Sequence, residues 1–238
     1  MIAAADRPGL AQFVSRVLRL DPTAVVRLRP EPDGPGSAWA MLPFRVLVAR
    51  RLSQPLPADV TVRAADLATA LTDGAVGDLV RRDEAWRWPV PTSAGRTVEH
   101  IPVAEVRRLA AAAARTLRQA LTEGVNGRAV GERVLRDALL DHVAIVVTGD
   151  DGERIEIPQR MVQALVRTGL LDATPATAGV GAQSVMADTV GIVVSASTES
   201  IDAVAVRRTM TWIGLSSRYG SAWYRPISPL RMSRGVDG

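Results

Sequence analysis

Apolar residues recur along the first third of the chain with two different periods. Between residues 8 and 20 they are spaced by three and four, which predicts a short helix. Apolar runs at Thr23 to Leu28, Ala38 to Leu42 and Arg45 to Leu52 predict three strands, the first two joined by a loop rich in proline and glycine. Helical spacing returns at residues 62 to 71, where we expect a second short helix.

The most regular pattern of the chain lies between Pro102 and Glu123. Its apolar residues are again spaced by three and four, and alanines, the best helix formers, fill the positions between them. Glycine follows at position 124, where a helix commonly ends. Small residues let another backbone approach closely, so we predict one long helix that serves as a central strut. Its apolar face consists of Val103, Val106, Ala110, Ala113, Leu117 and Leu121.

The second half of the chain alternates between helix and strand signals. The pattern predicts a helix at about 127–141, a hairpin of Val143–Thr148 and Arg154–Ile157, and a helix from Pro158 to Gly169. A buried strand is predicted at Val190–Val194, and a strand, or alternatively a helix, at Val204–Leu215. With the elements above, this favours the α+β class: short β-hairpins or a mixed sheet packed against several helices.

Two stretches and the C-terminal end carry little regular pattern. Residues 75–100 contain tryptophans, prolines and glycines and are interpreted as a long surface connection. Residues 173–187 are almost all small, which predicts a mobile loop, and residues 226–238 are expected to form a tail. The chain is therefore interpreted as a single globular domain, 1–238, or alternatively as two tightly packed lobes, about 1–96 and 97–238.

Composition excludes several kinds of chemistry. The 238 residues include no cysteine, which rules out disulfides, Cys-ligated zinc and iron–sulfur clusters, and only two histidines, His100 and His142. All basic residues are arginines, which the composition bias of a GC-rich genome would also produce. The net charge is +4, which is compatible with an anionic partner but does not demand one. We see no signal peptide and no membrane span, and we expect a cytoplasmic protein.

No pattern marks a catalytic, cofactor or metal site. Asp150 and Asp151 are adjacent carboxylates, but the glycines around them place both in a solvent-exposed turn. The glycines at 179 and 181 follow a predicted helix and precede a strand, the reverse of a nucleotide-binding loop. An enzyme whose site is assembled near His142 from scattered residues stays open as an alternative.

Four arginines of the predicted long helix share one face. At 100° per residue they fall within an arc of about 100°, opposite the apolar side. Such a stripe could bind phosphates along a nucleic-acid backbone, and the alternative is a solvated helix face. The stripe consists of Arg107, Arg108, Arg115 and Arg118.

Aromatic and cationic residues alternate in two further places. Trp and Arg often dominate protein–protein interfaces, and Arg can also hold an aromatic ring of its own chain by a cation–π contact. We interpret both groups as surfaces for a protein partner or for a second copy of the chain. They are Trp86, Arg87 and Trp88 in the long connection, and Arg218, Tyr219, Trp223, Tyr224 and Arg225 near the C-terminus.

These observations favour a non-catalytic intracellular interaction or regulatory protein without a cofactor. Its expected partner is another protein or the chain itself, bound through the surfaces rich in Arg, Trp and Tyr. Nucleic acid, bound by the arginine stripe, is the alternative partner, and no membrane partner is expected.

Overall fold

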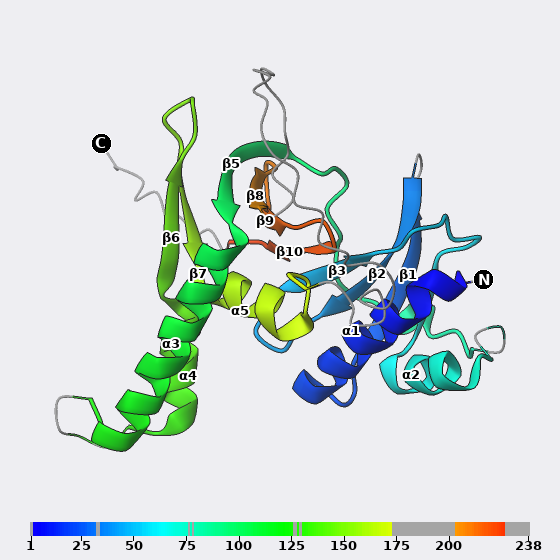
Figure 1. Cartoon of the computed structure of the whole chain (residues 1–238), viewed down its shortest axis with the longest axis horizontal. Helices are drawn as coiled ribbons and strands as arrows, with labels where there is room; N and C mark the ends of the chain where they lie inside the picture. Colours follow the sequence, from blue (N-terminus) through cyan, green and yellow to red (C-terminus); the bar gives the residue numbers. More distant parts are fainter. Residues whose placement is uncertain are drawn as a thin grey trace, which may run out of the picture.

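The computed structural model describes residues 2–31, 34–75, 77, 79–125, 128, 130–172 and 203–226. Five α-helices and a large antiparallel sheet within these residues confirm the predicted α+β class (Figure 1). The predicted loop at 173–187, the predicted strand at 190–194 and the tail after Pro226 lie outside the described residues. None of the described helices is long and apolar enough to span a bilayer.

One eight-stranded sheet runs through both halves of the chain. The pairing of β3 with β10 joins four strands from residues 25–63 to four strands from residues 96–102 and 203–224, and every pairing in the sheet is antiparallel. The proposed division into lobes at about residue 96 stays a prediction. The strand order is β4 (Val60–Arg63), β1 (Val25–Glu31), β2 (Gly34–Met41), β3 (Leu47–Arg51), β10 (Gly220–Tyr224), β9 (Ile213–Ser216), β8 (Ala203–Arg208) and β5 (Arg96–Pro102).

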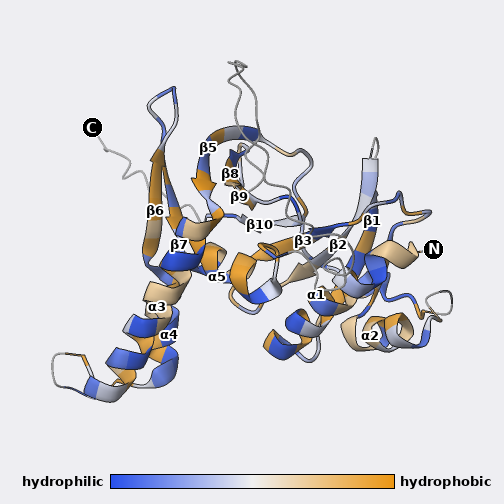
Figure 2. Cartoon of the chain, viewed as in Figure 1, coloured by the Kyte–Doolittle hydropathy of each residue, from blue (hydrophilic) through white to orange (hydrophobic). Residues whose placement is uncertain are grey.

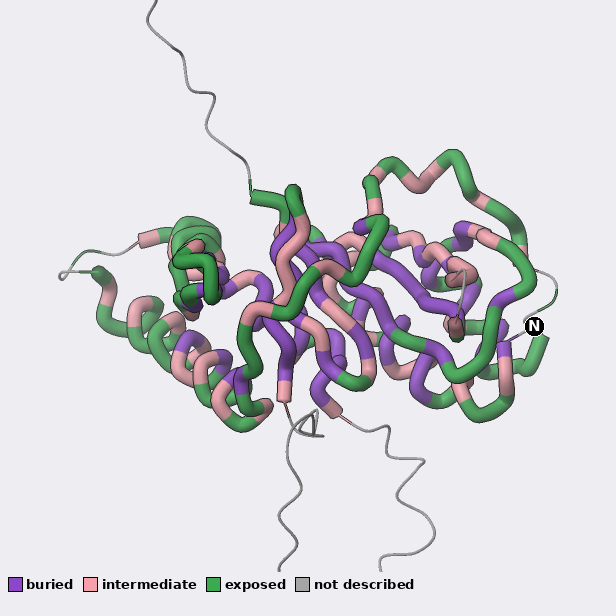
Figure 3. Tube along the Cα trace, turned by 90° about the horizontal axis from the view of Figure 1, so that it is seen from above, coloured by how far each residue is buried: buried purple, intermediate pink, exposed green. Residues whose placement is uncertain are grey.

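Three helices cover one face of this sheet. They are α1 (Arg7–Leu20), α2 (Ala64–Asp73) and α5 (Gln159–Thr168). Their apolar sides bury Phe13, Leu67 and Leu165 against every second residue of the strands, which is the core expected from a period of two in strands and 3.6 in helices. The most deeply buried segments accordingly lie in the sheet and beneath these helices (Figure 3).

The opposite face of the sheet carries a second, smaller apolar cluster. Trp39, Leu47, Ala49, Trp212 and Trp223 form this cluster, and part of the irregular connection packs on it. We call residues 79–95, which include the short 3-10 helix η3 (Asp83–Ala85), the covering segment. Because the described helices cover only the first face, side chains of alternate strand residues on the second face can form a site.

The predicted long helix is present as α3 (Val103–Glu123), but a central position for it is not confirmed. Only Val106, Ala110 and Ala113 are buried, all in its first half, and α4 (Glu132–Asp141) buries no residue. The two helices extend together away from the sheet, and their exposed ends alternate between polar and apolar residues (Figures 1, 2 and 3). Alanines offer little apolar area, which explains why the regular pattern did not produce a buried strut.

Two further segments differ from the predictions, and one agrees with them. The stretch 204–215 forms two strands, β8 and β9, with a turn between Arg208 and Ile213. The C-terminal aromatics, expected to precede a frayed tail, contain β10 in the middle of the sheet. The hairpin predicted after α4 is confirmed as β6 (Val143–Thr148) and β7 (Arg154–Pro158), a separate two-stranded sheet.

Candidate functional site

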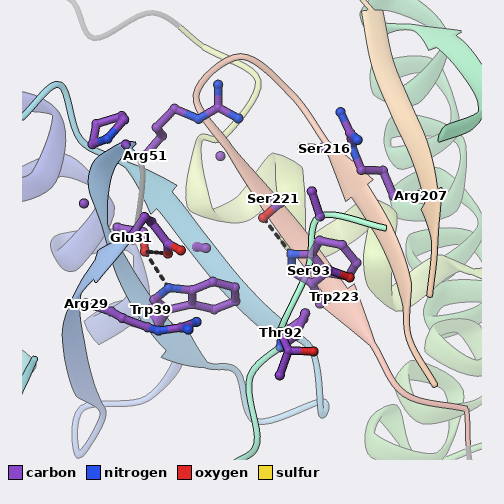
Figure 4. Close-up of a pocket in the computed structure, with 18 residues that line it drawn as sticks. Arg29, Glu31, Trp39, Arg51, Thr92, Ser93, Arg207, Ser216, Ser221 and Trp223 are labelled. Atoms are coloured by element: carbon purple, nitrogen blue, oxygen red, sulfur yellow. Dashed lines mark hydrogen bonds between the residues drawn. The ribbon is translucent and has the colours of Figure 1, made fainter. Parts of the chain in front are cut away.

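A pocket of about 480 Å³ lies on the face of the sheet opposite the three helices. Strand register brings its lining together, because directly paired residues point to the same face. Arg29, Ser37 and Arg51 form one row across β1, β2 and β3. We call this site the Arg/Trp pocket. Its lining includes Arg29, Glu31, Ser37, Trp39, Arg51, Thr92, Ser93, Arg207, Ser216, Ser221 and Trp223 (Figure 4).

Two indole rings are held rigidly at the base of the pocket. The Trp39 indole N–H donates to Ser37 Oγ at 2.7 Å, and the Ser37 hydroxyl donates to Glu31 Oε1 at 2.7 Å. The Trp223 indole N–H donates to Ser221 Oγ at 2.8 Å in the same i to i−2 arrangement. Trp39 is only 6% exposed and Trp223 only 4%, so their rings support the pocket but offer little surface on which a base could stack.

Cations dominate the charge of the pocket. Among the described residues, Arg29, Arg51 and Arg207 line it together with one carboxylate, that of Glu31, and these four side chains carry a formal charge of three minus one, or +2. None of the three arginines forms an ion pair with a carboxylate of the described residues, and Arg207 donates only to the Gly95 carbonyl at 3.5 Å. Unpaired guanidinium groups around a concave surface attract anions.

The covering segment closes one side of the pocket. Thr92 and Ser93 bring hydroxyl groups to the lining, while Arg51 and Arg207 stand on separate strands beyond them (Figure 4). Earlier in the covering segment, the Trp86 indole N–H donates to the Trp88 carbonyl at 2.6 Å, and the two rings meet edge to face with centroids 5.3 Å apart. These contacts order the segment locally around Trp86 and Trp88.

The start of the covering segment is attached to the edge strand β4. The Thr61 amide donates to Asp83 Oδ1 at 2.7 Å, and the Arg82 amide donates to the Thr61 carbonyl at 2.7 Å. The Thr61 amide, and after it the Arg81 guanidinium, hold the pKa of Asp83 below its ordinary value, because both stabilise the carboxylate. These bonds also satisfy the backbone amide and carbonyl of Thr61, which at the edge of the sheet could otherwise pair with a strand of another molecule.

The aromatic residues predicted to bind a partner mostly contact their own chain. Arg27 lies over Trp86 at 5.7 Å, Arg160 over Tyr224 at 5.3 Å, and Arg218 over Tyr219 at 5.1 Å. Trp223 belongs to the Arg/Trp pocket, whereas Trp88 and Arg225 line a separate cavity on the same face. Arg87 is exposed.

The arginine stripe of α3 is exposed, but half of its charge is neutralised. Arg107 pairs with Asp172 at 2.6 Å, and Arg108 pairs with Glu105 at 2.5 Å. The Arg108 guanidinium lowers the pKa of Glu105, and Glu105 in turn raises that of Arg108. Arg115 and Arg118 have no ion pair within the described residues, so the stripe offers two available cations rather than four.

Within the part of the chain that the structure describes, no recognisable catalytic group surrounds His142. A cavity of about 420 Å³ lies beside it, lined by Asp141 and Val143, but His142 itself is not part of the lining. Asp141 forms an ion pair with Arg160. Among the described residues there is no group of three potential metal ligands.

Arg29, Arg51 and Arg207 were not predicted as site residues. Arg29 lies on the polar phase of β1, whose alternate residues Val26 and Leu28 are buried, and this phase is a sequence signal that could have found it. Arg51 and Arg207 stand at or near the ends of β3 and β8, in phase with apolar residues, so no such signal marks them. Their convergence depends on pairing between β3 and β10, which are distant in the sequence. The periodicity of a single strand does not reveal such a pairing.

Fold and pocket together define an α+β protein with a cationic site on an open sheet face. The chain belongs to the family described as Domain of unknown function (DUF8185), which matches residues 90–229. A second description, Domain of unknown function (DUF8010), matches residues 1–88. No curated protein matches the chain.

Solved structures of DNA polymerase beta subunits have a similar fold. The beta subunit from DNA polymerase of Streptococcus pyogenes is 9% identical with a TM-score of 0.50, over 94% of this chain and 64% of that one. The DNA polymerase III beta subunit of Thermotoga maritima is 9% identical with a TM-score of 0.49, over 94% of this chain and 63% of that one. The DNA polymerase III beta chain from Streptococcus pneumoniae TIGR4 is 9% identical with a TM-score of 0.48, over 94% of this chain and 64% of that one. The chain thus spans less than two thirds of these proteins, and at this identity the likeness concerns the fold alone.

Proposed function

We propose that the chain is a non-catalytic intracellular interaction protein whose Arg/Trp pocket binds acidic side chains of a protein partner. The observation that carries the proposal is the set of three arginines that converge on the pocket without a carboxylate partner among the described residues. Guanidinium groups bind carboxylates through two parallel hydrogen bonds, and three of them on separate strands could hold acidic residues spaced along an extended segment.

The rest of the lining supports a protein ligand over a nucleobase. Both indole N–H groups already have partners, and the rings are almost fully buried, which leaves little face for stacking. Hydroxyl groups of Ser93, Thr92 and Ser216 can bond to the backbone of an extended peptide. Arginines and hydroxyl groups that donate hydrogen bonds make the pocket suited to holding an anion.

The test compares two matched double variants. The probe is a fluorescein-labelled decapeptide of alternating Glu and Ser, with a Gln/Ser peptide as the neutral control, and binding is followed by anisotropy. Arg51→Gln with Arg207→Gln removes two charges from the pocket, whereas Arg115→Gln with Arg118→Gln removes two charges from α3. We expect the first pair to weaken binding of the acidic peptide at least tenfold and the second to leave it unchanged. Equal binding of the two peptides, or equal loss in both variants, would refute the proposal.

Nucleic acid remains the second candidate partner, through Arg115 and Arg118. Both are exposed on a helix that extends away from the sheet, where a duplex could approach them, and the fold resembles that of a DNA polymerase beta subunit. Two phosphate contacts predict that the logarithm of the binding constant falls with the logarithm of salt concentration with a slope of about −2. Loss of duplex binding in the α3 variant, but not in the pocket variant, would support this function instead.

A further inference from the structure

A second cavity, of about 690 Å³, lies on the same face of the sheet. Ala85, Trp88 and Pro89 of the covering segment bound it, whereas Pro91 to Ala94 bound the Arg/Trp pocket. Its walls are mainly apolar, and two guanidinium groups stand among them. We call it the Arg45 cavity; its lining also includes Asp21, Thr23, Ala24, Val25, Met41, Leu42, Pro43, Trp212 and Arg225.

Arg45 adopts a backbone conformation that arginine rarely takes. Its φ is +62°, and it is the only non-glycine residue with a positive φ in the part of the chain that the structure describes. The residue closes the turn between β2 and β3, where its amide donates to the Leu42 carbonyl at 3.0 Å and the Leu42 amide donates to the Val46 carbonyl at 2.9 Å. Glycine or asparagine fits this position without strain, so the turn itself gives no reason for an arginine.

Both arginines of the cavity are available to a ligand. Neither Arg45 nor Arg225 forms an ion pair within the described residues. Asp21, the one carboxylate among the described residues of the lining, accepts hydrogen bonds from the Thr23 amide at 2.8 Å and the Thr23 hydroxyl at 2.7 Å. The described lining therefore has a formal charge of two minus one, or +1, beside an apolar surface that contains two indole rings.

We propose that the Arg45 cavity binds a small apolar carboxylic acid. Arg45 and Arg225 bind the carboxylate, while the walls formed by Met41, Trp88 and Trp212 take up the apolar part. The volume lies in the range of small-molecule sites, which are typically apolar with a few fixed polar groups. Local rules of turn sequence are commonly broken where a side chain serves a function, and this accounts for an arginine at position 45. The site is independent of the Arg/Trp pocket.

The test uses 3-phenylpropionate as the probe and its uncharged amide as the matched control. Binding is measured by calorimetry and by the fluorescence of the tryptophans in the wall. We expect the acid to bind and the amide to bind at least tenfold more weakly. Arg45→Gly should weaken binding of the acid at least tenfold while leaving Tm unchanged or raising it, because glycine relieves the strained turn. Arg225→Gln should also weaken binding, whereas Arg19→Gln, on α1, should not.

Three results would overturn the proposal. The first is equal binding of acid and amide, and the second is full binding by the Arg45→Gly variant. The third is much tighter binding of a pentapeptide with a free C-terminal phenylalanine than of the small acid, which would assign the cavity to a chain end. The double variant Arg51→Gln with Arg207→Gln should leave binding of 3-phenylpropionate intact, which separates this proposal from that for the Arg/Trp pocket.

Discussion

The indole of Trp223 lies directly across Gly214 of the neighbouring strand. These two residues are paired in the register of β10 and β9, and a Cβ atom at Gly214 would lie 2.6 Å from the Trp223 ring. On the other side of Gly214, the register places Arg207 of β8. Because glycine has no side chain, the Trp223 ring can occupy the space above Gly214, between β10 and the part of the Arg/Trp pocket that contains Arg207.

Substitution of Gly214 should therefore disturb both stability and the pocket. Gly214→Ala places a methyl group against a buried ring, and we expect the free energy of unfolding to fall by about 1–3 kcal/mol. Tryptophan fluorescence should shift as Trp223 moves. Gly34→Ala is the control, because nothing lies within 4 Å of a Cβ atom there, and its effect should stay within about 0.5 kcal/mol. Urea denaturation of both variants is the measurement, and equal effects would contradict the packing argument.

Ser37 is expected to stabilise the pocket through two hydrogen bonds. It accepts from the Trp39 indole and donates to Glu31, and it is itself buried. Ser37→Ala leaves a buried indole N–H without its partner, which should cost about 1–3 kcal/mol of unfolding free energy. Ser15→Ala, at an exposed position of α1, should cost little. A loss of less than about 0.5 kcal/mol at Ser37 would show that the bonds do not contribute.

The sequence pattern predicted the elements whose formation depends on residues close together in the chain. The helix from residue 8 and the helix from Pro158 were found because their apolar residues repeat within one turn. Strand β10 was missed because it consists mainly of small and aromatic residues, and it becomes a strand by pairing with β3 and β9. The Arg/Trp pocket was missed for the same reason, since its three arginines meet only through that pairing. Trp223 alone was predicted to contribute to a binding surface and also lies in the pocket.

Attachment of the covering segment should weaken in acid. The pKa of Asp83 is lowered by the Thr61 amide and by Arg81, so its carboxylate stabilises the fold above the ordinary Asp value of 3.8, and this contribution is lost as the pH falls through the lowered pKa. We expect the urea midpoint of the wild type to fall more steeply between about pH 4 and pH 2.5 than that of Asp83→Asn. Glu84→Gln, a neighbouring exposed acid, should keep the steep fall. Parallel curves for the wild type and Asp83→Asn would refute the role of this carboxylate.

Arg27 should hold the covering segment in a way that lysine cannot reproduce. Its guanidinium donates to both carboxylate oxygens of Asp59 at 2.7 Å and lies 5.7 Å from the centre of the Trp86 ring. The hydrogen bond to Asp59 raises the pKa of Arg27, although partial burial opposes it. Lysine keeps the charge but loses the planar pair of donors, so Arg27→Lys should cost about 1 kcal/mol of unfolding free energy and should speed hydrogen exchange across residues 79–95.

The exchange measurement distinguishes this specific role of Arg27 from a general loss of stability. In Arg27→Lys, amides of the covering segment should exchange several-fold faster, while those of α5, on the other face of the sheet, should exchange as in the wild type under conditions where local opening dominates. Arg63→Lys, on the edge strand β4, is the control and should change neither region. Faster exchange throughout the protein would mean that Arg27 stabilises the sheet as a whole, and the covering segment would then have to be held by Trp86 and Asp83 without it.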